Sequence, residues 1–197
     1  MTPPFTFGYL GRISADKGVG VLVEAFAALR GGVEDRQNVR LMVAGEPRFT
    51  NVDEGAELLA SLKSEPGLSV VGWVEAGPFL ESVDAVVVPS VAPESFGLVA
   101  AEAMAAGVLV IASDAGALPE VVGSVHPLLT AAGDAGVLAH TMQKTMELSD
   151  QERTRISGEQ LKRWLALWSP QAGRQRVAEI LGVPLATHDS NGYEMRL

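Results

Sequence analysis

The chain has 197 residues, of which 47% are hydrophobic, enough for the core of one α/β domain and too few for two full-sized domains. A net charge of -9, from 24 acidic and 15 basic residues, argues against a nucleic-acid partner, and the absence of cysteine excludes disulfides and thiolate metal sites. No secretory signal pattern opens residues 1–12, and no apolar run reaches the roughly 18 residues of a membrane span, so we expect a soluble, cytoplasmic domain without a direct membrane span.

Apolar runs alternate with helical patterns as far as residue 112. The runs are rich in Val, Leu and Ile on both faces, which is typical of parallel strands covered by helices on both sides. The sequence therefore predicts an α/β fold with a Rossmann-like, doubly wound parallel sheet of five or six strands. We expect strands at Phe5–Gly11, Val39–Ala44, Leu68–Val71, Ala85–Val88 and Val108–Ala112, and helices at Val19–Leu29, Glu54–Lys63, Pro78–Ser82 and Leu98–Ala106.

Helical patterns dominate the chain after Pro127. We expect helices at residues 131–147 and 150–167, and a last helix with Ser169 as N-cap and Pro170 as its first residue. These complete a single domain of residues 1–182, and the polar segment 183–197, without periodicity, is expected to be disordered. Three apolar residues of the last helix are expected to be buried, namely Val177, Ile180 and Leu181.

Doubly wound sheets bind ligands at the carboxyl ends of their strands, where the strand-to-helix loops gather. One such loop runs into the helix that begins near Leu98, and Gly97 lets a ligand approach its main chain. The free N–H groups of this helix start predict an anion site, and phosphate is the ligand that we expect there. Arg12 and Lys17 in the first loop carry charges that suit a pyrophosphate, although either alone is also typical of a solvated surface.

Two glutamates flank the same helix start, with seven residues between Glu94 and Glu102. A fully helical path would separate them by about 12 Å, and a loop at the start shortens this. That span suits two hydroxylated rings joined by a pyrophosphate, with Glu94 on a hexose and Glu102 on a ribose. Solvated surface acids and the acid–base pair of a glycosidase are alternatives, but the glycosidase leaves Arg12 and Lys17 without a role.

Other chemistries have little support in the sequence. The histidines are scattered and no Asp-x-Asp pair occurs, so we expect no metal and no cofactor other than the substrate itself. Walker-type, G-x-S-x-G and G-x-G-x-x-G motifs are likewise absent.

The segment PESFGLVAAEAMAAGVLVIASDAGALPEVV resembles the signature of the retaining, metal-independent glycosyltransferases of group 1, which carry an E-x(7)-E motif. Upstream, YLGRISADKGVGVLVEAF resembles the G-R-x-x-x-x-K-G segment of that family, and LMVAGEP and VVGWV resemble its next two strand ends. The resemblance covers residues 5–182 and implies a domain that binds a nucleotide-diphosphate sugar, in an enzyme that transfers a hexose with retention.

The resemblance also implies a role for each matching residue. Arg12 and Lys17 would bind the diphosphate, Glu102 the ribose, and Glu94 the transferred sugar near its reacting face, which makes Glu94, Arg12 and Lys17 the catalytic group. Charge on the leaving diphosphate would be stabilised electrostatically. The backbone near Val74 would meet the base, and main-chain amides would meet sugar and phosphate at Phe96, Gly97, Leu98 and Val99.

In that family two Rossmann-like domains form a GT-B fold with the active site between them, and this chain resembles only the second domain. The resemblance therefore implies an N-terminal acceptor-binding domain as partner, without which we expect little activity. A domain of this kind can also be a stand-alone nucleotide-sugar binding or regulatory module, or one subunit of a split glycosyltransferase. We expect a cytoplasmic location, with the missing domain as the part that would hold the protein peripherally at a membrane.

Overall fold

A computed structural model describes residues 3–32, 38–48 and 51–184. Most of the segment expected to be disordered, residues 185–197, lies outside these ranges. The six strands form one parallel sheet in the order β3-β2-β1-β4-β5-β6, which confirms the predicted doubly wound sheet. The strands are β1 (Phe5–Leu10), β2 (Val39–Ala44), β3 (Leu68–Gly72), β4 (Ala85–Val88), β5 (Leu109–Ser113) and β6 (Leu129–Thr130).

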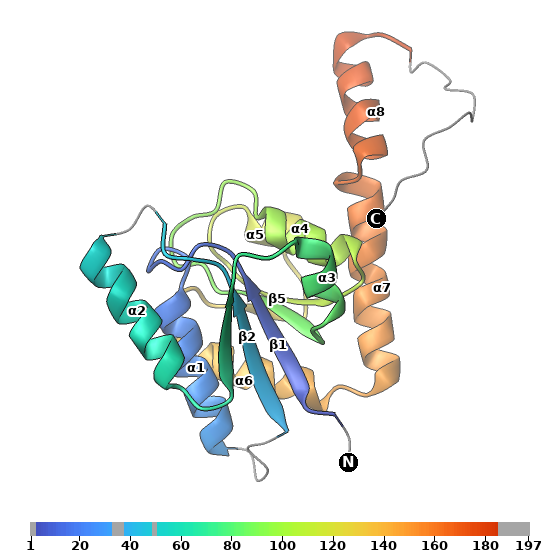
Figure 1. Cartoon of the computed structure of the whole chain (residues 1–197). Coiled ribbons are helices and arrows are strands. Elements are labelled where there is room, and N and C mark those ends of the chain that lie inside the picture. Colours follow the sequence, from blue (N-terminus) through green and yellow to red (C-terminus); the bar gives the residue numbers. More distant parts are fainter. Residues whose placement is uncertain (1–2, 33–37, 49–50, 185–197) are drawn as a thin grey trace.

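Helices cover both faces of the sheet (Figure 1). On one face lie α1 (Val19–Gly32), α2 (Val52–Ser64) and α6 (Ala135–Glu147), and on the other lie α3 (Ala76–Glu81), α4 (Leu98–Ala105), α5 (Leu118–Val122) and α7 (Asp150–Leu167). The last helix, α8 (Pro170–Leu181), leads away from the sheet beyond the end of α7.

Alternate residues of the central strands pack on opposite faces of the sheet. On β4, Ala85 and Val87 join the core under α1 and α6, whereas Val86 and Val88 join the core under α4 and α5. Because side chains alternate along a strand, a strand covered on both faces needs apolar residues at every position. This is the physical reason for the continuous apolar runs in the sequence.

Three short features differ from the sequence-based expectation. The short helix α5 and the two-residue strand β6 are not among the elements expected from the sequence, because neither is long enough to show a periodic pattern. Helix α6 begins at Ala135 rather than at 131, because the side chain of Asp134 accepts a hydrogen bond of 2.9 Å from the amide of Val137 and caps the helix there.

The expected burial of the apolar side of α8 is wrong. Val177, Ile180 and Leu181 are 55%, 82% and 66% exposed. The helix itself starts as predicted, with Ser169 as N-cap and Pro170 in the first turn. Periodicity reveals an apolar helix face, but it does not reveal whether the same chain covers that face, and the described residues do not cover it.

The strand order reverses between β1 and β4, because β1 pairs with β2 on one side and with β4 on the other. The loops that follow β1 and β4 are therefore neighbours, although their sequences are far apart. Gly18, with φ of 72°, lies so close to Pro89 that a Cβ atom would come within 1.9 Å of the Pro89 carbonyl oxygen. Ligands of such folds bind at this switch point.

This close approach predicts that Gly18→Ala destabilises the domain more than Gly107→Ala does. Gly107 has the same φ of 72° and nothing within 4 Å of its virtual Cβ atom. Gly107→Ala should then cost only the strain of a left-handed backbone, about 1–2 kcal/mol, and Gly18→Ala a further ~1–3 kcal/mol for the clash. Urea denaturation of both variants measures the difference, and equal losses of stability would contradict the close packing of the two loops.

Candidate functional site

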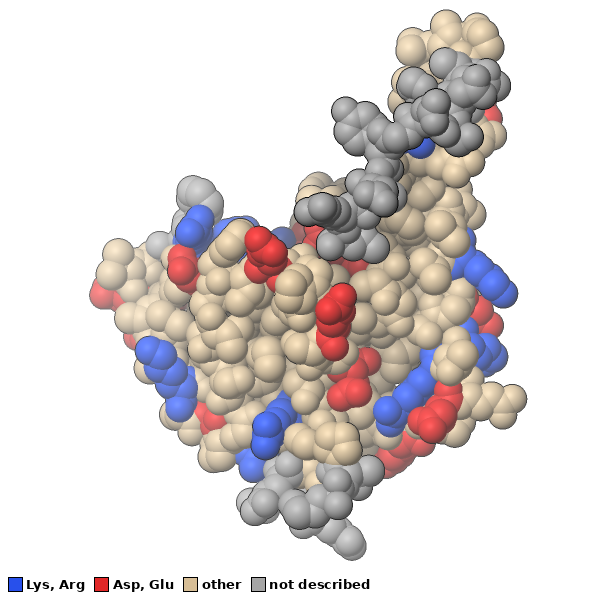
Figure 2. Space-filling model, turned by 45° about the vertical axis from the view of Figure 1, so that its right-hand side comes forward, with Lys and Arg blue, Asp and Glu red and all other residues tan. Residues whose placement is uncertain are grey.

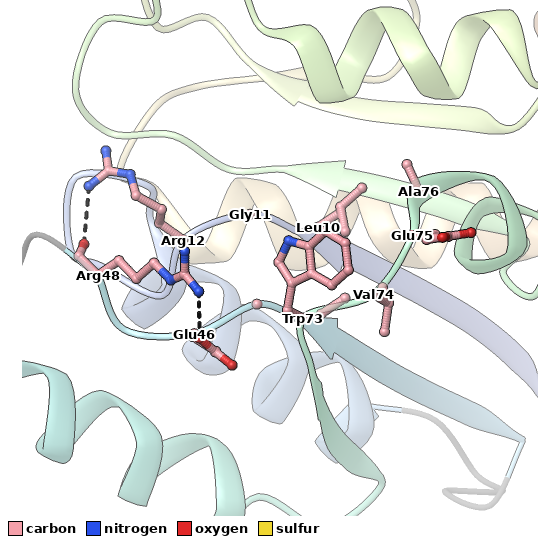
Figure 3. Close-up of a pocket in the computed structure, with 11 residues that line it drawn as sticks. Leu10, Gly11, Arg12, Glu46, Arg48, Trp73, Val74, Glu75 and Ala76 are labelled. Carbon is pink, nitrogen blue, oxygen red and sulfur yellow. Dashed lines mark hydrogen bonds and ion pairs between the residues drawn. The ribbon is translucent and has the colours of Figure 1, made fainter.

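Two adjoining hollows lie at the carboxyl edge of the sheet, and both are lined by Leu10 and Gly11. The first, of about 410 Å³, lies before α4 and is called the α4 hollow. The second, of about 570 Å³, lies beside the end of β3 and is called the Trp73 hollow (Figure 3). Among the residues that the structure describes, those that line the α4 hollow are Tyr9, Leu10, Gly11, Lys17, Val87, Val88, Pro89, Ser90, Glu94, Ser95, Phe96, Gly97, Leu98 and Val99.

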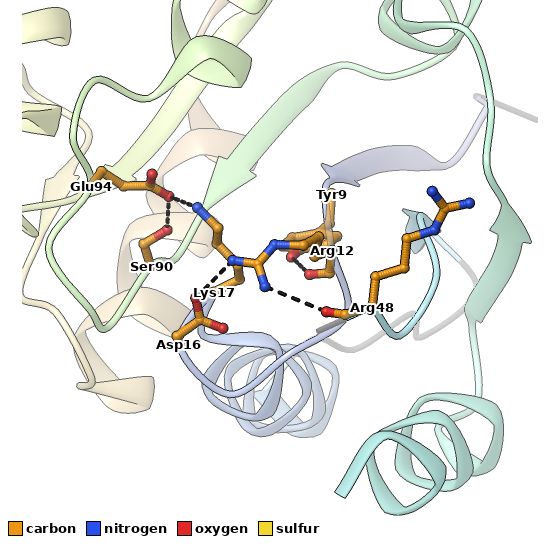
Figure 4. Close-up of polar contacts among 7 residues, drawn as sticks. All are labelled: Tyr9, Arg12, Asp16, Lys17, Arg48, Ser90 and Glu94. Atoms are coloured by element: carbon orange, nitrogen blue, oxygen red, sulfur yellow. Dashed lines mark hydrogen bonds and ion pairs between the residues drawn. The ribbon is translucent and has the colours of Figure 1, made fainter. Parts of the chain in front are cut away.

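An ion pair between Lys17 and Glu94 crosses the switch point between β1 and β4 (Figure 4). The Lys17 ammonium lies 2.6 Å from Glu94 Oε1, and the Ser90 hydroxyl donates to the same oxygen at 2.6 Å. The two charged side chains are 27% and 14% exposed, so both are partly shielded and still reachable from the α4 hollow. The sequence predicted that both residues lie at this edge, and the structure brings them into direct contact.

Backbone hydrogen bonds hold the Glu94 loop from two sides. The amides of Val91 and Ala92 both donate to the Asp16 carbonyl at 3.0 Å, which ties this loop to the loop after β1. On the other side, the amide of Ala117 donates to the Glu94 carbonyl at 2.9 Å. Because the loop is fixed at both ends, the carboxylate of Glu94 has a defined position before any ligand arrives.

The start of α4 offers unpaired main-chain donors to the α4 hollow. Gly97 is the N-cap with φ of 94° and ψ of 57°, a left-handed conformation, and no side chain caps the helix. The first amides of a helix have no partner within the helix, so this start attracts anions. The ring of Phe96 packs edge-on against Trp168 with centroids 5.2 Å apart, which leaves the main chain of Phe96 as the part available to a ligand.

Arg12 lines the neighbouring Trp73 hollow, on the other side of the shared residues Leu10 and Gly11. Its guanidinium donates to Asp16 Oδ2 at 3.1 Å and to the Arg48 carbonyl at 3.4 Å, and its own carbonyl accepts the Tyr9 hydroxyl. Burial, with the charge of Asp16, raises the pKa of the Tyr9 hydroxyl well above its ordinary value, so the hydroxyl stays protonated as a donor.

The carboxyl of Asp16 is held in its charged form. Its pKa lies below the ordinary value because the nearby Ser14 hydroxyl favours the carboxylate, an effect that outweighs partial burial and that the Arg12 and Lys17 cations reinforce. Asp16 therefore supplies a negative charge to the site loops at neutral pH.

The predicted site residues fall into three groups. Lys17, Glu94 and the turn 96–99 line the α4 hollow, while Arg12 and Val74 line the Trp73 hollow. Glu102 lies in the second turn of α4, exposed, and lines neither hollow. Its role on a ribose stays a prediction.

Sequence reasoning missed four residues of the site. Ser90 supports Glu94, and Tyr9 supports the loop of Arg12. Trp73 and Arg48 line the Trp73 hollow. Three of them could have been found from their place in the sequence. Tyr9, Trp73 and Ser90 lie at or just beyond the carboxyl ends of strands, where this fold binds its ligands.

The described surface and interior add two findings on partners. On the face drawn in Figure 2, Lys and Arg are interspersed with Asp and Glu and form no extended basic area. Within residues 3–32, 38–48 and 51–184, no helix is long and apolar enough to span a bilayer, and no cluster of three acidic or histidine side chains is arranged to hold a metal ion.

Comparison with known sequences identifies relatives of this chain. The family profile described as "Glycosyl transferases group 1" matches residues 4–147. The lipopolysaccharide 1,2-N-acetylglucosaminetransferase of Salmonella typhimurium is 38% identical over 122 residues, which cover 58% of this chain and 31% of the relative. The D-inositol 3-phosphate glycosyltransferase of Mycolicibacterium smegmatis is 32% identical over 164 residues, covering 77% of this chain and 35% of the relative.

Solved structures show the same fold. The Anabaena protein Alr3699/HepE, crystallised with UDP and glucose, superposes with a TM-score of 0.78 at 27% identity, covering 91% of this chain and 48% of that one. The C-terminal domain of a glycosyl transferase group 1 family protein, LpcC from Francisella tularensis, superposes with a TM-score of 0.72 at 25% identity, covering 86% of this chain and 89% of that domain.

The chain thus spans 31% to 35% of the length of these two curated relatives and 48% of the Anabaena structure. The family match covers residues 4–147, which include all the predicted site residues, and the similarity to the LpcC domain extends over nearly the whole of that domain. This protein belongs to the glycosyl transferases group 1 family and has the Rossmann-like fold of the C-terminal half of a GT-B glycosyltransferase.

Proposed function

We propose that this chain binds the nucleotide-diphosphate sugar donor of a retaining hexosyltransferase. One observation carries the proposal: a lysine, a carboxylate and an uncapped helix start converge on one hollow at the switch point, where Lys17 lies 2.6 Å from Glu94. Cations and main-chain donors suit a diphosphate, and a carboxylate suits the hydroxyls of a sugar. The Anabaena relative, crystallised with UDP and glucose, supports this assignment.

In this proposal, donor binding separates the ion pair of Lys17 and Glu94 and gives each side chain a partner on the donor. The diphosphate lies over the start of α4 and takes Lys17 as a counter-ion, which releases the carboxylate of Glu94 toward the hexose. Arg12 reaches the diphosphate from the other side of Gly11, where its partner Asp16 is 44% exposed and the exchange costs little. Glu102 holds the ribose and the backbone near Val74 meets the base.

The proposed chemistry is electrostatic. The bond between the anomeric carbon and the diphosphate oxygen breaks while the acceptor oxygen bonds to the same face of the sugar, and the acceptor proton passes to the leaving diphosphate. Negative charge grows on the diphosphate as it leaves, and Lys17, Arg12 and the first amides of α4 stabilise it. With these cations in place, the proposal requires no divalent metal.

The acceptor site belongs, in this proposal, to a second domain that packs on the apolar side of α8. The exposure of Ile180 and Leu181, at 82% and 66%, supports a covering partner, as does the partial coverage of the relatives. The same two observations suit a separately encoded acceptor subunit, so a split enzyme or a binding module is the second candidate. A cytoplasmic location, direct or through a membrane-associated partner domain, is part of the proposal.

Removal of either site cation should weaken nucleoside diphosphate binding. Arg12→Ala and Lys17→Ala should each raise the Kd about tenfold in calorimetric titrations with UDP, GDP and ADP, since each removes a charge-assisted contact to phosphate. Arg155→Ala is the matched control for Arg12→Ala. Arg155 lies 3.0 Å from Glu159 four residues along α7, as Arg12 lies 3.1 Å from Asp16 four residues along its loop.

The control variant should bind like the wild type, and EDTA should leave all affinities unchanged. The proposed function is wrong if none of the three diphosphates binds, or if Arg155→Ala weakens binding as much as Arg12→Ala.

Glu94→Gln should separate the sugar from the diphosphate. The substitution removes the charge that pairs with Lys17, so bare nucleoside diphosphates should bind as well as before or a few-fold tighter. The matching nucleotide sugar should bind about tenfold more weakly, because a charged acceptor of its hydroxyls is lost. Glu102→Gln is the comparison, because both ligands contain the ribose and the loss of a ribose contact should weaken the binding of both equally. Equal weakening of both ligands by Glu94→Gln would refute a role on the sugar.

A further inference from the structure

Trp73 is a large apolar side chain in an unusual place. It follows directly after β3 at the carboxyl edge of the sheet and is 70% exposed. The other two tryptophans, Trp164 and Trp168, pack against the core on the side of α7. Burial of an indole is worth several kcal/mol, so one left at the rim of a hollow is available for contact with something outside the described chain.

The lining of the Trp73 hollow combines apolar and charged side chains. Among its described lining residues, the apolar ones are Leu10, Ala44, Val74 and Ala76, and the polar side chains are all charged: Arg12, Glu46, Arg48 and Glu75. No amide or hydroxyl side chain lies among them. The charge of Arg48 is already paired, because its guanidinium lies 3.1 Å from Glu46 Oε2. A flat, apolar ligand surface fits such a lining better than a ligand that needs neutral hydrogen-bonding side chains.

The position of the hollow relates it to the proposed diphosphate. Leu10 and Gly11 belong to both hollows, so a ligand whose diphosphate lies over the start of α4 continues past Gly11 into the Trp73 hollow. Figure 3 shows the indole beside Leu10, with Arg12 and Arg48 on one side and Glu75 on the other. The far end of a nucleotide donor bound in this way would therefore lie at the indole.

We propose that the base of the donor stacks on the face of Trp73, and that this chain prefers purine over pyrimidine nucleotides for that reason. The inference rests on the proposed function and names the class of donor. Stacking on an aromatic side chain tolerates any base, and its strength grows with the overlapping ring area. A bicyclic purine overlaps an indole more than a monocyclic pyrimidine does, and the volume of about 570 Å³ accommodates either.

The test is a set of titrations with ADP, GDP, UDP, CDP and inorganic pyrophosphate. The wild type should bind the purine diphosphates about fivefold or more tightly than the pyrimidine diphosphates, and Trp73→Ala should weaken ADP and GDP about tenfold. The affinity for pyrophosphate should not change, because pyrophosphate has no base. Trp73→Phe should recover most of the loss, since a phenyl ring also stacks. Val71→Ala is the control, because Val71 is a 43% exposed residue of β3, the strand that Trp73 follows.

Fluorescence supplies a second readout that a merely structural role would not move. Purine diphosphates should quench the emission of the wild type, and the quenching should disappear in Trp73→Phe while Trp164 and Trp168 remain.

Three results would overturn the inference. The first is equal binding of purine and pyrimidine diphosphates by the wild type. The second is unchanged nucleoside diphosphate binding in Trp73→Ala, which would make the indole a contact for another protein surface. In both cases the proposed function survives, because diphosphates bind. Failure of every diphosphate, pyrophosphate included, to bind the wild type would overturn the proposed function and this inference with it.

Discussion

The ion pair of Lys17 and Glu94 lies where the strand order of the sheet reverses, and the rest of the site is arranged around it. The pairing of β1 with both β2 and β4 forces the loops after β1 and β4 to leave the sheet side by side. Residues 77 positions apart then meet at 2.6 Å. The same constraint places the uncapped start of α4 beside them, so a cation, a carboxylate and free amides share one hollow without any movement of the backbone.

Three cations of the site are each paired with a carboxylate while no donor is bound. Lys17 pairs with Glu94, Arg12 with Asp16 and Arg48 with Glu46, at 2.6 Å, 3.1 Å and 3.1 Å. The pairs of Arg12 and Arg48 are the more exposed ones and contribute little to stability, so a dianionic ligand can exchange their partners at small cost. A chain with a net charge of -9 can thus still present a site for a diphosphate, because Lys17, Arg12 and Arg48 lie at this edge of the sheet.

The sequence predicts the central architecture because buried strands and amphipathic helices give different patterns of apolar residues. Strands covered on both faces must be apolar throughout, as Ala85–Val88 is, and helices such as Val19–Gly32 repeat their apolar residues every three or four positions. The proximity of Lys17 and Glu94 follows in outline from the rule that parallel strands end at one edge. Their direct contact, and its support from Ser90, depend on loop conformations that periodicity does not encode. The exposure of Trp73 and Ile180 is equally invisible in the sequence, because burial depends on what covers a residue.

The most direct test of diphosphate binding at the switch point is the backbone amide spectrum of the isotopically labelled domain during titration with a nucleoside diphosphate. Donor binding at the switch point should give the largest shifts to the amides of Gly97, Leu98 and Val99 at the α4 start and of Gly11 and Lys17 in the loop after β1. The diphosphate accepts hydrogen bonds and places its charge there. Shifts confined to the opposite edge of the sheet, around Thr6 and Asp84, would contradict it.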